Sequence, residues 1–184
     1  MGGAAKGMMH PYDDFSMTFS DMATLIMLVS SGDTKAIEKV DGINIFWYLH
    51  EDGKPRDSLS IGECRNRGLT MAQFQNKLKT HPGRMQFIAG AEAIQYRVDN
   101  GMRWMGPKSG QHWVNTEIIY TKSPQTFQYD CDSLVYHDYC MLSADRKSMV
   151  SIKDIYQREW RFFIENELAQ SNENPWKLYH ELPL

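Results

Sequence analysis

Residues Ile43 to Leu49 read INIFWYL, a run dominated by β-branched and aromatic residues. Asp41-Gly42 precedes the run and Asp52-Gly53 follows it. An apolar run between turn-forming residues predicts a β-strand. Glu51-Asp52-Gly53-Lys54 predicts the turn of a hairpin, with a return strand that runs through Leu59 to Cys64. The sequence therefore predicts a sheet that begins with this hairpin.

Periodic apolar residues predict helices beside the sheet. Thr18 with Asp21, and Thr70 with Gln73, have the spacing of capping boxes, and Ser151 is the expected cap of the last helix. The expected helices cover about 19–30, 70–79, 85–98 and 152–168, and further strands are expected at Trp113–Tyr120 and Leu134–Tyr136. This mixed order favours an α+β fold, with antiparallel sheets and flanking helices, over a doubly wound sheet. We expect a flexible arm over residues 1–9, one domain over 10–170 and a loosely structured tail over 171–184.

The composition limits the classes of protein to be considered. The chain has 184 residues, 42% hydrophobic and 12% aromatic, which is enough for a packed core. Its net charge of −3 excludes a uniformly basic nucleic-acid coat. Three cysteines are too few for a disulfide framework, and Met22 to Val29 is too short to cross a bilayer. We therefore expect a soluble intracellular protein that does not act at a membrane.

The charge is unevenly distributed along the chain. Residues 1–53 hold three bases and eight acids, a net of −5, whereas residues 54–84 hold seven bases and two acids, a net of +5. A basic segment of this kind could contact the phosphates of a nucleic acid. The alternative is a solvated surface that happens to be basic.

The clearest chemical motif lies just before the first predicted strand, in Lys39-Val40-Asp41-Gly42. Lys39 and Asp41 are two residues apart, so they point to the same side of an extended chain. Gly42 leaves room for a ligand to approach the backbone. A lysine amine becomes nucleophilic when its surroundings or a base remove its proton, and beside a triphosphate and a metal ion it could attack the α-phosphorus. The alternative is a surface lysine beside a turn-forming Asp-Gly pair.

Four segments, in this order, resemble motifs of the covalent nucleotidyltransferases, the family of ATP-dependent DNA and RNA ligases and capping enzymes. Lys39 to Gly42 resembles the first motif, Lys-x-Asp-Gly, and Arg65-Asn66-Arg67-Gly68 is similar to the arginine-containing segment that follows it in RNA ligases. Trp113 to Ile119 is similar to the third motif, and Leu134 to Asp138 resembles the aromatic strand that comes next. The opening His10 to Asp14 also resembles bacteriophage proteins with a ligase-like domain. The resemblance covers roughly residues 10 to 140.

This resemblance implies a role for each matching residue. Lys39 would form a lysyl-AMP phosphoramidate from ATP, with Asp41 and Gly42 in the nucleotide site. Arg65 would contact ribose or phosphate, and Tyr136 would stack on adenine. Glu117 would hold the ribose or a water bound to Mg²⁺. Glu92 competes for this acidic role, but it lies in a predicted helix, so we prefer Glu117; the alternative for Glu117 is an outward-facing strand carboxylate.

The sequence also departs from the family pattern. Asn44 stands where the family usually has an arginine, and no Glu-Gly fourth motif or Lys-x-Lys fifth motif follows Asp138; Lys153 is the nearest candidate. We therefore expect either a truncated enzyme core, which is the front part of a longer protein, or a degenerate phage structural or assembly protein that keeps the fold for binding. The first would act in the host cytoplasm, and the second would belong to the virion and its assembly partners.

Two further hypotheses rest on fewer residues. Cys131, His137 and Cys140 could bind Zn²⁺, although the sequence offers no obvious fourth ligand. A plain nucleic-acid-binding module would use the basic segment 54–84, but that segment lacks regularly interleaved aromatic residues.

Overall fold

The computed structural model describes residues 18–32, 42–122, 130–169 and 177–180. These residues fall into two compact units: one contains helix α1, and the other contains the sheet and the remaining helices. Among the described residues, no helix has both the length and the apolar character needed to cross a bilayer.

Helix α1 (Phe19–Ser31) has the ends that the sequence predicts. The Thr18 hydroxyl accepts a hydrogen bond from the Asp21 N–H, and the Asp21 carboxylate accepts one from the Thr18 N–H at 2.8 Å. Gly32 ends the helix with a φ of 80°, a left-handed conformation that favours glycine. No residue of α1 is buried. Its capping residues, rather than a buried face, therefore specify this helix.

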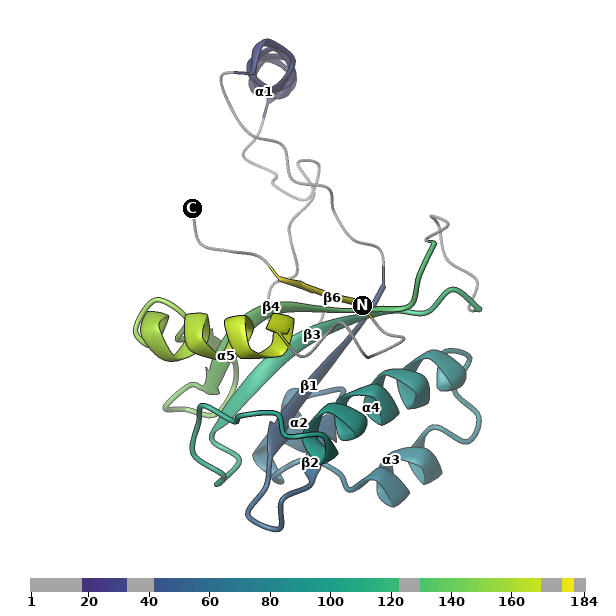
Figure 1. The fold of residues 1–184 in the computed structure, drawn as a ribbon. Coiled ribbons are helices and arrows are strands. Elements are labelled where there is room, and N and C mark those ends of the chain that lie inside the picture. The colour runs from purple at the N-terminus through teal and green to yellow at the C-terminus, as the bar shows by residue number, and fades with distance from the viewer. Residues whose placement is uncertain (1–17, 33–41, 123–129, 170–176, 181–184) are drawn as a thin grey trace. The chain divides into compact units, whose positions relative to one another are not determined.

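The second unit is built on one sheet of six described strands (Figure 1). The strands are β1 (Ile43–Leu49), β2 (Pro55–Ser58), β3 (His112–Ile119), β4 (Ser133–Leu142), β5 (Met149–Ser151) and β6 (Lys177–His180). Five of them follow the order β2-β1-β3-β4-β5 with antiparallel neighbours, and β6 pairs in parallel with the first half of β4. This arrangement confirms the predicted α+β class with an antiparallel sheet. Strand β6 lies within the range 171–184, for which we expected a loose structure.

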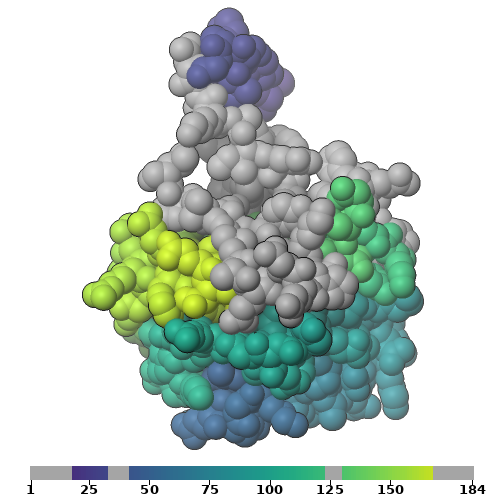
Figure 2. Space-filling view, in the orientation of Figure 1, coloured from purple at the N-terminus to yellow at the C-terminus, as the bar shows by residue number. Residues whose placement is uncertain are grey.

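Three helices pack on one side of this sheet, which we call the first face: α3 (Met71–Lys77), α4 (Arg84–Asp99) and α5 (Gln157–Ala169). Figure 1 shows α4 and α5 in front of the strands, and in Figure 2 their teal and yellow-green surfaces cover part of this side. The core between helices and sheet includes Trp47, Phe74, Ile94, Tyr136 and Phe163, all fully buried.

Helix α4 lies very close to β3. The Gln86 side-chain amide donates a hydrogen bond of 2.8 Å to the Ile118 carbonyl. One turn further along, a Cβ atom placed on Gly90 would overlap the Ile118 side chain. Glycine within a helix costs about 1 kcal/mol relative to alanine. The close approach of β3 explains why a glycine is nevertheless present.

The opposite side of the sheet, the second face, has a smaller core. It contains Phe46, Tyr48, Trp113 and Cys140, and helix α2 (Ile61–Arg65) contributes Cys64. The Tyr48 and Trp113 rings meet edge to face with centroids 4.6 Å apart. This small core covers only part of the second face, and the rest of that face carries polar residues.

The predicted return strand from Leu59 to Cys64 is wrong. Strand β2 ends at Ser58, and Ile61–Arg65 forms α2. The reason lies in Ser60 and Glu63, which have capping-box spacing: the Ser60 hydroxyl accepts a hydrogen bond from the Glu63 N–H. The Glu63 carboxylate in turn accepts one from the Leu59 N–H at 2.7 Å.

The predicted start of the last helix is also wrong. Ser151 lies in β5, and its hydroxyl donates to the Asp138 carboxylate at 2.7 Å instead of capping a helix. Helix α5 begins at Gln157. Its apolar stripe is nevertheless present, because Trp160, Phe163 and Ile164 are all buried.

Candidate functional site

The second face of the sheet carries a set of polar side chains at one end. Asn44 of β1 pairs with Glu117 of β3, and Asn115 of β3 pairs with Asp138 of β4. Residues directly opposite each other in antiparallel strands share a face. Because Trp113, Asn115 and Glu117 alternate along β3, all of these polar side chains lie on the face that also carries Trp113.

Two groups hold the Glu117 carboxylate, one at each oxygen. Its Oε1 accepts a hydrogen bond of 2.5 Å from the Gly42 N–H. Its Oε2 lies 2.7 Å from His137 Nε2. The residue is only 8% exposed, and a carboxylate buried to this extent needs such partners. We call Gly42, Glu117, His137 and Lys153 the Glu117 cluster.

Gly42 is required here because β3 approaches it closely. A Cβ atom at Gly42 would lie 2.5 Å from the Ile118 carbonyl oxygen and 2.8 Å from Glu117 Cγ. The sequence suggested that the missing side chain leaves room for a ligand. In the structure the neighbouring strand and the glutamate itself occupy that room.

His137 reaches Glu117 through an irregularity in β4. Tyr136 pairs with Thr116 and Asp138 pairs with Asn115, so His137 is an extra residue between two regular pairs, which is a β-bulge. Its backbone carbonyl accepts a hydrogen bond of 3.1 Å from Lys153 Nζ. Lys153, the nearest candidate for a fifth-motif lysine, therefore contacts the residue that binds Glu117, and it lies outside any helix.

Asn115 and Asp138 extend this polar region. Asn115 is 5% exposed, and its Oδ1 has no hydrogen-bond partner among the residues that the structure describes. Asp138 Oδ1 accepts hydrogen bonds from the Ser151 hydroxyl and from the Tyr139 N–H. Asn115 thus places an unpaired buried acceptor in this polar region.

The two other key residues of the first motif, Lys39 and Asp41, lie outside the described residues. Gly42, the last residue of that motif, is described and contacts Glu117. The structure thus brings together two of the predicted site residues. Glu92, the alternative acid, is exposed on α4.

Arg65 lies far from Glu117. Its Nε donates to the Arg146 carbonyl, and Arg146 Nη2 donates to the Arg65 carbonyl at 2.6 Å. Arg146 follows the end of β4 at Leu142, whereas Glu117 pairs with Val135 near its start. At a rise of about 3.3 Å per residue, the two places are separated by roughly 20 Å. The structure does not bring Arg65 and Glu117 together.

Tyr136 lies on the opposite side of the sheet from Glu117. Its ring is fully buried and stacks on Phe163, with centroids 5.4 Å apart. Its partner Thr116 also faces the first-face core, where its hydroxyl accepts a hydrogen bond from Trp47 Nε1. Burial, with the nearby Glu167 carboxylate, raises the pKa of Tyr136 well above its usual value. A nucleotide held by Glu117 does not meet this ring in the present arrangement.

Cys140 is buried as a free thiol, which does not favour zinc binding. Burial, followed by the charge of Asp138, raises the pKa of Cys140, and a zinc ligand must be a thiolate. His137 is already bound to Glu117. Across the described part of the chain, no group of three or more His, Cys, Asp or Glu side chains has a geometry suited to a metal ion.

The basic segment 54–84 is partly neutralised by ion pairs, one of them with its own Glu63. Lys77 pairs with Glu63, and Arg56 pairs with Asp52 at 2.5 Å. Lys54, Arg65 and Arg67 are exposed. The segment therefore presents fewer free cations than its composition suggests.

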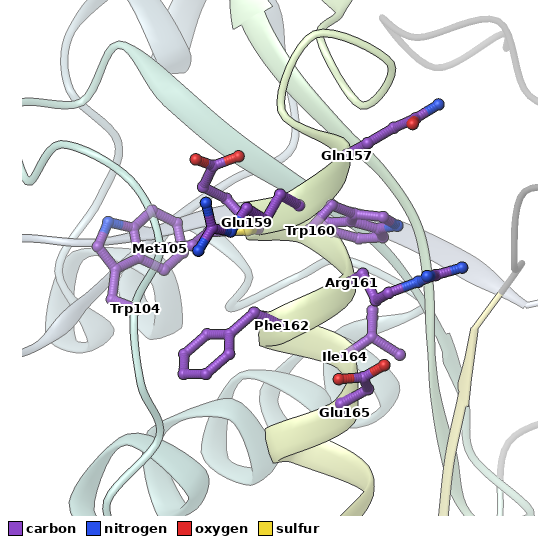
Figure 3. A pocket seen from close by; sticks show the side chains of 10 residues that line it. Trp104, Met105, Gln157, Glu159, Trp160, Arg161, Phe162, Ile164 and Glu165 are labelled. Carbon is purple, nitrogen blue, oxygen red and sulfur yellow. The ribbon is translucent and has the colours of Figure 1, made fainter.

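A pocket of about 870 Å³ lies elsewhere, beside α5 (Figure 3). Trp104 and Met105 line one side of it, and α5 contributes residues from Gln157 to Glu165. Figure 3 shows Phe162 on the same side of α5 as Trp104. None of the predicted site residues is among the described residues that line this pocket.

Comparisons of the chain with protein-family models, with curated proteins and with solved structures found no match. Sequence reasoning missed the contact of His137 with Glu117 and the buried Asn115 Oδ1, which has no hydrogen-bond partner among the described residues. The alternation of Trp113, Asn115 and Glu117 could have revealed Asn115, because residues two apart on a strand share a face.

Proposed function

We propose that the chain is a ligase-like nucleotidyltransferase domain that forms a lysyl-AMP intermediate on Lys39. One observation carries the proposal: the Gly42 N–H binds the Glu117 carboxylate at 2.5 Å. This contact ties the end of the Lys-x-Asp-Gly segment to the acidic strand that the resemblance pairs with it. Lys153, whose Nζ donates to the His137 carbonyl, would supply a cation for the phosphates of ATP.

The proposed reaction exchanges one bond to phosphorus for another. Lys39 Nζ forms a bond to the α-phosphorus of ATP, and the bond from that phosphorus to the bridging oxygen of the β-phosphate breaks. Pyrophosphate leaves with the electron pair, and the lysine ammonium loses two protons in all. Because phosphoryl-type transfer depends chiefly on positioning and charge, a fixed carboxylate and a nearby ammonium suit it.

We infer that Glu117 would hold one Mg²⁺ ion, bound mainly through the substrate. Each Glu117 oxygen accepts one hydrogen bond, so each keeps a free lone pair. Mg²⁺ sites commonly use one or two carboxylates, with phosphates and water as the other ligands. When bound, Mg²⁺ would neutralise charge on the triphosphate, and Glu117 is the described residue placed to hold it.

Self-labelling tests the proposal directly. The protein is incubated with Mg²⁺ and ATP labelled on the α-phosphate, then denatured and separated. We expect a label that is acid-labile and stable to alkali, as a phosphoramidate is, and a mass increase of one AMP. Lys39→Ala should abolish it, whereas Lys54→Ala, which changes an exposed lysine in the hairpin turn, should not. Label from γ-labelled ATP, or none from α-labelled ATP, would contradict the proposal.

A second candidate, binding without transfer, is favoured by the position of Tyr136. The residue that the resemblance assigns to adenine stacking is buried on the first face, and Asn44 replaces the usual arginine. Such a protein would bind ATP without becoming labelled and would serve in a phage particle or its assembly. Equilibrium dialysis with ATP, run beside the labelling assay, separates the two functions.

A further inference from the structure

We propose that His137 is a positioning residue, which fixes the Glu117 carboxylate for the nucleotide reaction. This inference rests on the proposed function. The resemblance assigns no role to this histidine, and the sequence suggested only zinc binding for it. The direct observation is the distance of 2.7 Å between His137 Nε2 and Glu117 Oε2.

The chemistry of the two groups assigns the hydrogen on this contact. An ionised carboxylate can only accept hydrogen bonds, so the proton lies on His137 Nε2. Both the neutral Nε2–H tautomer and the imidazolium can supply it. The glutamate thus has one donor from the backbone at Gly42 and one from the side chain at His137.

The backbone of β4 is distorted in the way that this contact requires. His137 is the extra residue of the bulge, and Asp138, which immediately follows it, pairs with Asn115 on the second face. A bulge interrupts the regular hydrogen-bond ladder, and bulges recur beside functional sites, where they redirect a side chain. Here the bulge directs the imidazole to the carboxylate of the neighbouring strand.

Lys153 also holds His137 in place, through its backbone. Its Nζ donates to the His137 carbonyl at 3.1 Å, at the bulge itself. The bulged residue is therefore held by its side chain at Glu117 and by its backbone at Lys153. A carboxylate fixed by two donors, one from β4 and one from the residue that precedes β1, cannot rotate freely about its side-chain bonds.

The Glu117 carboxylate is therefore already oriented for the reaction before the substrate binds. The free lone pairs of Glu117 keep one direction, so ribose or bound Mg²⁺ meets them without rearrangement. Outer partners of this kind typically contribute about 10–100-fold to activity. We therefore expect loss of His137 to lower the rate of lysyl-AMP formation by about that factor, with a smaller effect on the ATP concentration that gives half-maximal rate.

Three substitutions test the role: His137→Gln, His137→Asn and His137→Ala. The Gln side-chain nitrogen can reach the position of His Nε2, whereas the shorter Asn reaches only that of Nδ1. We expect Gln to retain most of the labelling rate, and Asn and Ala to lose about 10–100-fold. Gln and Asn are both neutral amides, so their difference isolates the reach of the donor, and thermal unfolding of each variant shows whether it is folded.

A second readout does not depend on activity. With ¹³C in the glutamate carboxyl groups, the Glu117 resonance is assigned by its disappearance in Glu117→Gln. We expect this resonance to shift in His137→Ala and in His137→Asn, and to stay near its wild-type position in His137→Gln.

The two readouts separate the failure of this inference from the failure of the proposed function. If the wild type is never labelled but the Glu117 resonance follows the expected pattern, the proposed function fails and His137 still positions Glu117. If the wild type is labelled and His137→Ala is labelled equally fast, the inference is overturned and the proposed function stands. Equal loss in Gln and Ala would also overturn it, because the imidazole would then have a role other than donating from Nε2.

Discussion

Arg97 of α4 and Glu167 of α5 form an ion pair of 3.1 Å inside the core, where they are 3% and 1% exposed. Burial raises the pKa of Glu167, and the Arg97 guanidinium opposes that rise. The pair joins two helices that cover the first face of the sheet. Glu167 and Arg97 respond differently to the loss of the partner. The Glu167 carboxyl group can take up a proton and become neutral, whereas the Arg97 guanidinium stays charged.

We expect Glu167→Leu to lower the free energy of unfolding by about 3–5 kcal/mol, because it leaves the Arg97 charge buried. Arg97→Met should cost less, because the Glu167 carboxyl can become protonated. Urea unfolding of the two variants and of the double variant measures these values. The double variant should be more stable than Glu167→Leu alone; simple addition of the two losses would contradict this account.

The carboxyl group of Asp57 predicts a pH dependence of stability. It is 1% exposed, and neither oxygen has a hydrogen-bond partner among the described residues. Burial raises its pKa to about 7 from 3.8. Between these pH values the folded state binds a proton that the unfolded state has released, so stability is full below pH 3.8 and falls as the pH rises through 7.

The ionisation of Asp57 lowers the free energy of unfolding by at most about 4 kcal/mol, because one pKa unit corresponds to about 1.36 kcal/mol. Asp57→Asn should flatten the fall, and at pH 8 it should be more stable than the wild type. Thermal unfolding at a series of pH values measures this. The exposed Asp154 provides the control, and Asp154→Asn should keep the wild-type slope. A wild-type slope in Asp57→Asn would show that other groups cause the dependence.

The close approach at Gly42 predicts the effect of adding one methyl group. Gly42→Ala would place Cβ against the Ile118 carbonyl and Glu117 Cγ, and we expect a loss of about 1–3 kcal/mol in stability together with slower self-labelling. Gly62→Ala is the matched control, because its Cβ would meet only Ser60 Oγ at 3.8 Å. That variant should be neutral or gain up to about 1 kcal/mol. Equal stability of the two variants in urea would argue against the packing account.

Gly90 and Ile118 should be energetically coupled. Gly90→Ala improves helix propensity by about 1 kcal/mol, but its Cβ overlaps the Ile118 side chain, so we expect a net loss of about 1–3 kcal/mol. In an Ile118→Ala background the overlap is removed, and the same substitution should cost little. A double-mutant cycle measured by urea unfolding gives the coupling, and a value near zero would contradict this contact.

The parts of the fold that could be predicted from sequence are those with short-range causes. The run Ile43 to Leu49 forms β1 as predicted, and the capping residues Thr18 and Thr70 begin α1 and α3. In each case the deciding residues lie close together in the sequence. The Ser60 and Glu63 pair has the same local character but was missed, because the apolar residues around it also fit a strand.

The parts that could not be predicted depend on pairing between distant strands. In a regular strand, successive side chains point to opposite faces of the sheet. This pattern correctly places His137 on the face opposite Tyr136, but it also places Asp138 on the same face as Tyr136. The bulge reverses this, and it is visible only in the register of β4 against β3. The positions of Arg65 and Lys153 have the same origin, since Arg146 and His137, their partners, come from other elements.

Because His137 is the extra residue of the bulge, deletion of one codon would remove its contact with Glu117. Loss of the single codon for residue 137 would join two regular pairs, Tyr136 with Thr116 and Asp138 with Asn115, into an uninterrupted ladder. The strand would become more regular while the imidazole disappeared. The gain in the ladder would be offset at the site, because the buried Glu117 carboxylate would lose one of its two donors.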